Sequence, residues 1–489
     1  MSKRPIALAM VGVVGFFFAH QLPAQAPKKP RPKPAAAAPA AAPAPAWGDE
    51  LRNVVATPEE LRPIDPRLLE PLDWPAPPIG SPPRLVNAIY VNAWAFGTRR
   101  FYDLVRLADT TEINAFVIDV KDDTGHLTYL SEVPTAIQIG ANKELRAPDA
   151  RKRLALLHQH GIYPIARIVV AKDPLLAAKK PAWSVQHRDG GLWRDRLNFA
   201  WVDAYNDSVW VYAAQLAAEA VQLGFSEVQF DYVRFPDEPR ARLATAVFPA
   251  RRPGESTRDG VKRNLSLLRD RVKSLGVPFT IDVFGMTAST DVDLGIGQVW
   301  EDLVSRADVV LPMVYPSHYY GGFYGIRHAN SEPYAVVRRA LQDGLRRSSK
   351  VANAADLRPY LQAFTLGRPR YTPEMIREQI RAVEDVGLRS WVLWNPRAVY
   401  DPRIFSPNLG RPVVPAASMP VVRLVSQPAA PADSASAAAV DSEPTAVIDS
   451  PPIAVVDSAL TAAVNVAPAS AVDSVPMVNR PGPTPIDSL

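Results

Sequence analysis

Residues 227–236 read Glu-Val-Gln-Phe-Asp-Tyr-Val-Arg-Phe-Pro, and this stretch indicates the fold. It is rich in β-branched and aromatic side chains, which is typical of a buried strand. Side chains alternate between the two faces of a strand, so Gln229 and Asp231 share one face. The preceding pattern at 209–223 has a helical period and is followed by Gly224, which suits a helix C-terminus. A helix, a glycine and a short buried strand form the repeating unit of α/β proteins.

The same unit recurs on both sides of this stretch. The expected strands lie at 87–95, 115–121, 163–170, 227–233, 278–284, 308–315, 359–366 and 390–395. Helical patterns between them cover 101–107, 151–160, 209–223, 261–275, 299–306, 334–345 and 373–386. Eight short strands with seven intervening helices predict an α/β fold of the (β/α)8 TIM barrel type. The competing doubly wound sheet favours a glycine-rich turn after its first strand, and Asn-Ala-Trp-Ala-Phe-Gly at 92–97 is not one.

In such a barrel the active site lies at the C-terminal ends of the strands. The polar and aromatic candidates there are Tyr90, Asn92, Trp94, Asp119, Lys121, Arg167, Gln229, Asp231, Asp282, Tyr315, Gln362, Trp394 and Asn395. Strand alternation places Asp119 and Lys121 on one face of 115–121. Charges in otherwise apolar strands are costly unless they are paired, so Lys121 and Arg167 are expected partners of the aspartates. A purely structural charge network is the alternative interpretation.

This combination of residues suits glycoside hydrolysis. That reaction uses two carboxyl groups, one protonated to release the leaving oxygen and one ionised for attack or for activation of water. We expect Asp231 to be the nucleophile or base and Asp282 to be its carboxyl partner. Asp119, Lys121 and Arg167 would tune charge and hold hydroxyl groups. Aromatic side chains at the same strand ends, Trp94, Tyr315 and Trp394, would stack on sugar rings.

Metal-dependent hydrolysis is the natural rival on a barrel, because it needs several histidines or carboxylates that converge. The chain has 7 histidines and no cysteine. Only Asp122, Asp123 and His126, in the loop after the second strand, approach the spacing of metal ligands, and a solvated loop explains them as well. We therefore predict no metal and no cofactor.

Four motifs carry a resemblance to a known family. They are 116–122 (Phe-Val-Ile-Asp-Val-Lys-Asp), 228–236, 280–285 (Thr-Ile-Asp-Val-Phe-Gly) and 311–319 (Leu-Pro-Met-Val-Tyr-Pro-Ser-His-Tyr). Together they resemble a largely uncharacterised bacterial family of glycoside hydrolases with a (β/α)8 barrel, which is distantly similar to α-amylase-type barrels. The resemblance covers roughly 84–400.

The resemblance implies a role for Asp231, which occupies the place of the catalytic carboxylate on the fourth strand. Two positions depart from the α-amylase-type pattern: Asp282 stands where the fifth strand supplies a glutamic acid, and Gln229 replaces an arginine. We also expect Arg234 and His318, which lie within the motifs, to contact substrate. The predicted function is cleavage of a glycosidic bond in a polysaccharide or oligosaccharide. A non-catalytic glycan-binding barrel and a metal-dependent polysaccharide deacetylase are the alternatives.

Composition separates this barrel, 84–405, from two arms. Of 50 prolines, 17 lie in 22–83 and 14 in 406–489, which predicts a proline-rich linker at 27–83 and a disordered tail at 406–489. The tail repeats Asp-Ser every eight residues from Asp433 to Asp457. Most basic residues of the barrel lie on expected helix faces, without the clustered basic and aromatic stripe of a nucleic-acid-binding surface, so no nucleic-acid partner is predicted.

The N-terminus predicts export. Lys3 and Arg4 precede an apolar stretch at 6–19, which has the length of a secretory signal and is too short for an ordinary membrane span. Ala-Gln-Ala at 24–26 resembles a cleavage site, although the proline after it disfavours cleavage there. Residues 1–26 are therefore expected to be a signal peptide or a short membrane anchor. The predicted location is the periplasm or cell envelope, with a possible membrane tether through this segment.

Overall fold

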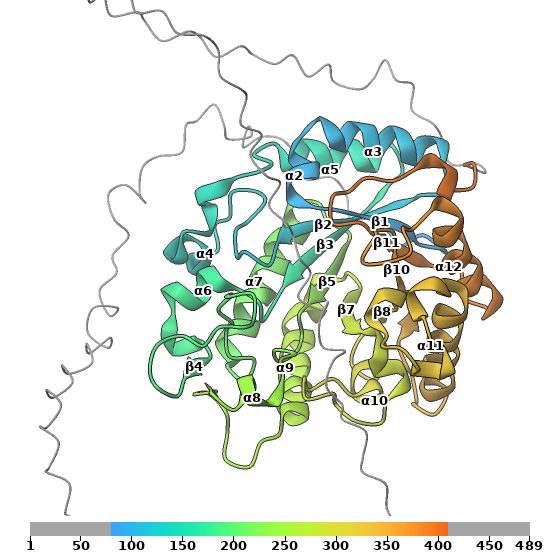
Figure 1. Ribbon diagram of the computed structural model, residues 1–489. Helices are drawn as coiled ribbons and strands as arrows, with labels where there is room; N and C mark the ends of the chain where they lie inside the picture. Colours follow the sequence, from blue (N-terminus) through green and yellow to red (C-terminus); the bar gives the residue numbers. More distant parts are fainter. Residues whose placement is uncertain (1–79, 409–489) are drawn as a thin grey trace, which may run out of the picture. The chain divides into compact units, whose positions relative to one another are not determined.

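Eight parallel strands close into a barrel in the computed structural model, which describes residues 80–408 (Figure 1). They are β1 (Asn87–Val91), β2 (Ala115–Lys121), β3 (Tyr163–Val169), β5 (Glu227–Asp231), β7 (Phe279–Phe284), β8 (Val309–Met313), β10 (Tyr360–Gln362) and β11 (Trp391–Trp394). The barrel closes where β11 pairs with β1 and where Tyr360 of β10 pairs with Met313 of β8. A short strand, β9 (Asp356–Leu357), precedes β10 and also pairs with β8. The predicted (β/α)8 barrel is confirmed.

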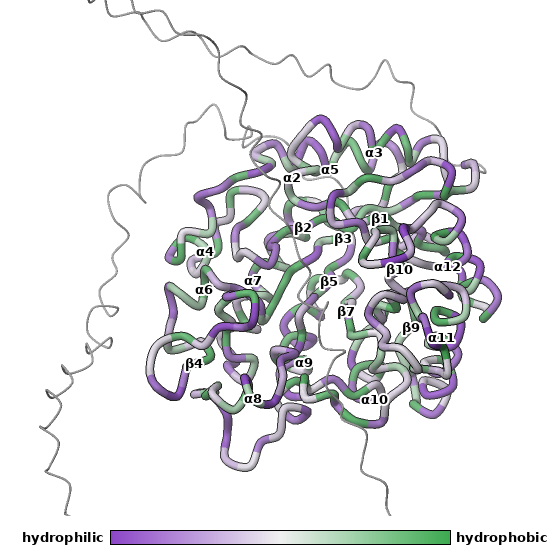
Figure 2. The backbone as a smooth tube through the Cα atoms, viewed as in Figure 1, coloured by the Kyte–Doolittle hydropathy of each residue, from purple (hydrophilic) through white to green (hydrophobic). Residues whose placement is uncertain are grey.

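Helices fill the connections between the strands. They are α2 (Ala93–Gly97), α3 (Arg99–Thr110), α4 (Pro134–Ile139), α5 (Ala150–Gln159), α6 (Pro174–Lys179), α7 (Asp207–Leu223), α8 (Arg240–Leu243), α9 (Thr257–Val272), α10 (Trp300–Val304), α11 (Pro333–Ser348) and α12 (Pro373–Asp385). Two short antiparallel strands, β4 (Gln186–His187) and β6 (Ala246–Val247), join the loops after β3 and β5. Figure 2 shows hydrophilic and hydrophobic residues alternating along the turns of α3, as expected for a helix with one buried face.

Local sequence explains where the longer helices begin and end. Thr372 caps α12 by accepting a hydrogen bond from the Met375 backbone N–H at 3.3 Å, and Pro373 takes the first helical position. Gly224 follows α7 with a φ of +125°, a conformation that favours glycine. The predicted positions of the major helices and their glycine caps are therefore confirmed within a few residues.

Several strands end earlier than predicted, among them β5 at Asp231 rather than 233 and β10 at Gln362 rather than 366, and two errors change the place of a candidate site residue. The first strand ends at Val91 rather than at 95, because the Asn92 side chain accepts a hydrogen bond from the Ala95 backbone N–H and caps α2. Trp94 therefore lies on a helix, where it is 59% exposed, and does not share an inward strand face with Tyr90.

The second error concerns Lys121. The register of β2 against β3 shifts between Asp119 and Lys121, and this irregularity breaks the alternation. Lys121 instead forms an ion pair of 2.5 Å with Asp173, which caps α6, and its ammonium lies 5.4 Å from the ring centre of Tyr212 on α7. Lys121 thus faces the helices and does not share the face of Asp119.

The predicted arms lie outside the described residues, except that 80–83 and 406–408 fall at the ends of the barrel. The export segment, most of the linker and the repeat tail therefore stay predictions. Within 80–408, no helix has the length and apolar composition that a bilayer crossing requires.

The interior of the barrel holds a buried ion pair below the strand ends that carry the site. Arg358 donates from Nη1 to Oε1 of Glu227 at 2.7 Å and from Nη2 to Oε2 at 3.3 Å. Glu227 begins β5, and both side chains are buried. Apolar residues that include Val117, Ile165 and Leu311 fill the rest of this interior.

Removing one partner of the Arg358–Glu227 ion pair tests how much the pair contributes to the stability of the barrel. We expect Arg358→Met to lower the free energy of unfolding by about 3–5 kcal/mol, because Glu227 is left buried without a cation. Arg403→Met is the matched control. Its ion pair with Asp401 lies at the surface, where solvent screens it, so we expect a much smaller loss. Urea unfolding of both variants measures the difference, and equal losses would contradict this account.

Candidate active site

Arg167 lies at the centre of the candidate site. The strand register pairs it with Asp119 of β2 on one side and with Gln229 of β5 on the other. Its Nη1 donates to Asp119 Oδ1 at 2.6 Å, and its Nη2 donates to Asp231 Oδ2 at 2.5 Å. Its Nε donates to the same oxygen of Asp231 at 3.2 Å. One buried guanidinium therefore joins carboxylates from the two neighbouring strands.

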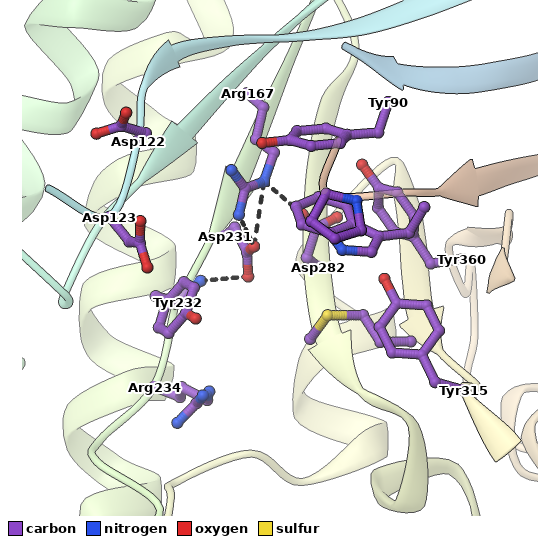
Figure 3. A pocket seen from close by; sticks show the side chains of 13 residues that line it. Tyr90, Asp122, Asp123, Arg167, Asp231, Tyr232, Arg234, Asp282, Tyr315 and Tyr360 are labelled. Atoms are coloured by element: carbon purple, nitrogen blue, oxygen red, sulfur yellow. Dashed lines mark hydrogen bonds and ion pairs between the residues drawn. The ribbon is translucent and has the colours of Figure 1, made fainter. Parts of the chain in front are cut away.

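Asp282 of β7 brings a third carboxyl group to the same cation. Its Oδ2 lies 3.8 Å from Arg167 Nε and accepts a hydrogen bond of 3.0 Å from Gln229 Nε2. Gln229 Nε2 also donates to the Tyr360 hydroxyl oxygen at 2.6 Å. Among the described residues, Asp282 Oδ1 is buried and has no hydrogen-bond partner. Asp231 and Asp282 thus form a carboxyl pair against one nitrogen atom of Arg167 (Figure 3).

Tyr232 turns the chain away from the barrel directly after Asp231. Its φ is +53°, in the left-handed region that residues other than glycine rarely adopt. Its backbone N–H donates to Asp231 Oδ1 at 2.6 Å. Strain of this kind costs about 1–3 kcal/mol and is often found at functional sites. The turn fixes Asp231 at the strand end, where its two oxygens accept hydrogen bonds from three nitrogen atoms.

Two aromatic rings cover the other side of the guanidinium. Tyr90 and Trp394 stack with ring centres 3.7 Å apart, and the centre of the Arg167 guanidinium lies 4.9 Å from the Trp394 ring centre. The Tyr90 hydroxyl donates to Asp119 Oδ2 at 2.5 Å. These rings exclude water from the ion pairs, and aromatic faces attract a cation.

A pocket opens over this network at the C-terminal ends of the strands. It has about 620 Å³ of empty space, its mouth included, and is lined by Tyr90, Asp122, Asp123, Arg167, Asp231, Tyr232, Arg234, Asp282, Met313, Tyr315, Tyr360, Trp394 and Pro396. Figure 3 shows Asp122 and Asp123 on one side, Tyr315 and Tyr360 on the other, and Arg167 with Asp231 between them. The pocket therefore presents a carboxyl pair between a charged wall and an aromatic wall.

Burial raises the pKa values of two of these carboxyl groups, those of Asp119 and Asp282. It raises the pKa of Asp119 to about 6, although the Arg167 charge opposes the rise. Burial, followed by repulsion from the Asp231 charge, raises the pKa of Asp282 well above its usual range. Burial alone would lower the pKa of Arg167, but Asp231 and Asp119 outweigh it and raise the pKa, so the guanidinium stays charged. Asp282 therefore carries a proton more readily than an ordinary aspartate does.

The structure brings together most of the side chains that the sequence singled out. Tyr90, Arg167, Asp231, Arg234, Asp282, Tyr315 and Trp394 line the pocket. Asp119 and Gln229 lie directly behind them and contact Arg167, Asp282 or Tyr360. His318 lies in a neighbouring recess that shares Met313 and Tyr315 with the pocket.

Three predicted substrate-binding amides instead hold the loops. Asn92 donates to the Pro396 carbonyl oxygen, and Asn395 donates to the carbonyl oxygens of Ala363 and Val399. Gln362 accepts from the Ser317 backbone N–H and donates to the Phe364 carbonyl oxygen. Because these contacts occupy the amides, we assign them to positioning the strand-end loops. Lys121 and Trp94 also lie away from the pocket lining, for the reasons given above.

Tyr360 is one of the pocket residues that were not predicted from the sequence. It lies two residues before Gln362 on the same strand and therefore shares its face, so the alternation that selected Gln362 could also have selected Tyr360. Met313 and Pro396 were missed as well, and nothing in their residue types signals a site.

The loop after β2 does not gather metal ligands. Asp122 pairs with Arg146 at 3.0 Å and Asp123 pairs with Lys172 at 2.8 Å, while the nearest carboxylate to His126 is that of Glu144, at 3.9 Å. Burial raises the pKa of Asp123, but the charge and hydrogen bond of Lys172, together with the Arg167 charge, outweigh burial, and the net effect lowers the pKa. Within 80–408, no three histidine, aspartate or glutamate side chains are placed to hold a metal ion. The donor set required by the deacetylase alternative is therefore not assembled.

The fold and the site define a class, the (β/α)8 barrels with a charged pocket at the C-terminal ends of the strands. The particular family follows from sequence: residues 88–400 match the family described as "Putative glycosyl hydrolase domain", and this chain belongs to that family. The predicted resemblance is confirmed, and family membership makes this barrel a glycosidase. No curated protein matches the chain.

Three solved structures are similar to parts of this chain. A hypothetical protein from Ruminiclostridium thermocellum ATCC 27405 is 37% identical, with 39% of this chain and 94% of that chain covered and a TM-score of 0.35. The glycoside hydrolase domain of PgaB (BpsB) from Bordetella bronchiseptica is 14% identical, with 64% and 95% covered and a TM-score of 0.46. The alpha-galactosidase TtGalA from Thermus thermophilus is 15% identical, with 64% and 58% covered and a TM-score of 0.39.

Replacing Arg167 tests its part in the network. In Arg167→Met, three buried carboxyl groups lose their cation, and we expect a loss of about 3–5 kcal/mol in unfolding free energy at pH 7. Arg167 holds down the pKa values of Asp119 and Asp282, so its removal raises both further. A folded-state pKa above the unfolded value means that stability is lost as the pH rises. The deficit relative to wild type should therefore shrink as the pH falls from 7 toward about 5.

Urea unfolding at the two pH values measures this change, with Arg403→Met as the surface control. A deficit that is the same at both pH values would show that the buried carboxyl groups do not depend on the Arg167 charge.

Proposed function

We propose that Asp231 and Asp282 are the carboxyl pair with which this glycosidase cleaves a glycosidic bond of a polysaccharide or oligosaccharide. The observation that carries the proposal is their shared position: both lie at ion-pair distance from Arg167 Nε, in the pocket at the strand ends, in unlike surroundings. A glycosidase needs two carboxyl groups in opposite protonation states. The raised pKa of Asp282 keeps a proton on one member of such a pair.

Asp282 is suited to the role of general acid. Burial and the neighbouring Asp231 charge raise its pKa, which keeps a proton on the carboxyl group. Its Oδ1 is buried and makes no hydrogen bond within the described part of the chain, so no protein group there competes for a proton on that oxygen. In the proposed step this proton moves to the glycosidic oxygen as the bond between that oxygen and the anomeric carbon breaks.

Asp231 is suited to act on the anomeric carbon. Three nitrogen donors, two on Arg167 and the backbone N–H of Tyr232, fix the orientation of its carboxylate. It attacks the carbon as a nucleophile or removes a proton from an attacking water molecule; in both cases the carboxylate enters the step ionised. Arg167 and Asp119 act as positioning residues, because they reach the reaction through Asp231.

The walls of the pocket supply contacts for sugar rings. Tyr315 and Trp394 are aromatic residues of the pocket lining beside the carboxyl pair, and Arg234 lines the pocket with its guanidinium 4.8 Å from the Tyr232 ring centre. Trp94 is proposed as an outer platform for a longer chain. Its exposed ring stacks on Arg146, and Arg146 pairs with Asp122 of the pocket wall. Action outside the cytoplasm is proposed from the export signal in the sequence alone.

The Asp231→Asn variant tests the nucleophile or base. We expect hydrolysis in a panel of envelope and plant polysaccharides to fall by about 10³-fold or more, because an amide neither attacks nor accepts the proton. Glycan binding and the circular dichroism spectrum should be retained. Asp189→Asn, on an exposed loop, is the matched control and should keep full activity. Full activity in Asp231→Asn would contradict the assignment. Binding by wild type and variant with hydrolysis by neither would select the glycan-binding barrel instead.

The Asp282→Asn variant tests the acid. We expect a loss of about 10²- to 10⁴-fold on an unactivated glycan and a much smaller loss on a nitrophenyl glycoside, whose leaving group needs no proton. Because the proton on Asp282 is lost as the pH rises, the decline of wild-type kcat at high pH should disappear in the variant. Rates measured across pH on both substrates test whether Asp282 is the general acid. Equal losses on the two substrates, with the alkaline decline intact, would assign the acid elsewhere.

A further inference from the structure

A second, smaller recess opens beside the carboxyl pair. It is lined by Phe284, Gly285, Met286, Met313, Tyr315, His318 and Tyr319, and it shares Met313 and Tyr315 with the main pocket. Phe284 lies two residues after Asp282, at the end of β7. The recess therefore adjoins the main pocket at Met313 and Tyr315 and lies at the end of the strand that carries Asp282.

The chemistry of this recess differs from that of the main pocket. No carboxylate, lysine or arginine lines it, and its walls are largely thioether and aromatic surface. Gly285 forms part of the wall because β7 and β8 approach closely there: a Cβ at this position would lie 2.2 Å from the Met313 carbonyl oxygen.

The size of the recess is also restrictive. The recess has about 240 Å³ of empty space, its mouth included, against about 620 Å³ for the main pocket measured in the same way, so it suits a substituent of the sugar rather than the sugar itself. A hydroxyl group placed against these largely apolar walls would exchange its hydrogen bonds to water for few partners, because the polar atoms of the lining, the Tyr319 hydroxyl and His318 Nε2 among them, are buried, and this exchange costs free energy. A methyl group would instead gain from leaving water and from contact with sulfur and aromatic rings.

We propose that this recess binds a methyl-bearing substituent of the sugar and so makes the enzyme prefer methyl-bearing sugars. The inference rests on the proposed function, because it places the sugar ring against Asp231 and Asp282. Two sugar classes supply the group: an N-acetylated amino sugar through its acetamido methyl, and a 6-deoxy sugar through its ring methyl. In either class one methyl group in an apolar chamber contributes about a 10- to 200-fold preference.

Pairs of sugars with and without the methyl-bearing group distinguish the two sources of the methyl, an N-acetylated amino sugar and a 6-deoxy sugar. Binding is measured by NMR titration or calorimetry for N-acetylated gluco, galacto and manno sugars against the parent hexoses. The same is done for D-fucose, L-fucose and L-rhamnose against D-galactose, L-galactose and L-mannose. We expect at least about a 10-fold preference for the methyl-bearing member of a pair. The series in which it occurs identifies the class, and the absence of a preference in both series overturns the proposal.

Met286 supplies the matched variants, because it lines the recess and not the main pocket. Met286→Gln places an amide of similar length in the recess and should reduce the preference to near unity. Met286→Leu keeps the recess apolar and should preserve it. Thermal melts establish that both variants fold. An unchanged preference in Met286→Gln would overturn the proposal, because the methyl group would then lie elsewhere.

These binding experiments test the recess assignment independently of the catalytic assignment. If the methyl preference holds while Asp231→Asn keeps full hydrolytic activity, the recess is confirmed and the assignment of Asp231 fails. If Asp231→Asn is inactive and no methyl preference appears, the proposed function stands and the recess assignment fails.

Discussion

The site depends on one buried cation shared by three carboxyl groups. Arg167 is 4% exposed, and Asp119, Asp231 and Asp282 approach it from three different strands. Burying an unpaired charge in a barrel interior costs free energy, so the guanidinium and the carboxylates each lower the cost of burying the other. Since one positive charge faces three carboxyl groups, a proton on one of them reduces the excess negative charge. The raised pKa of Asp282 places that proton opposite the tightly held Asp231.

The fold could be predicted almost completely because its signals are local. Buried parallel strands are short apolar runs, and glycine or proline marks the helix ends, so β2 was predicted to the residue. The errors arose where a side chain rather than periodicity decides the backbone. Asn92 caps a helix where alternation predicted more strand, and the irregularity after Asp119 turns Lys121 toward Asp173. Neither the Asn92 cap nor the irregularity after Asp119 can be recognised from the periodicity of the sequence.

The charged part of the site was also predictable, and its polar surroundings were not. Acids and an arginine in apolar strands are rare enough to be noticed, and the barrel geometry places their strand ends together. Asn395 and Gln362 resemble substrate-binding amides in sequence, yet they hydrogen-bond to loop backbone instead. The small recess could not be foreseen at all, because it depends on the close approach of β7 and β8 at Gly285.

The division of protonation between Asp231 and Asp282 is the central claim, and infrared difference spectroscopy tests it most directly. Spectra of wild type and Asp282→Asn are compared at pH 7 in the carbonyl stretching region of protonated carboxyl groups. The account predicts a protonated-carboxyl band in wild type that is missing in the variant. If the two spectra show no difference in that region, Asp282 is ionised at neutral pH. The carboxyl pair would then lack the proton that its proposed chemistry needs.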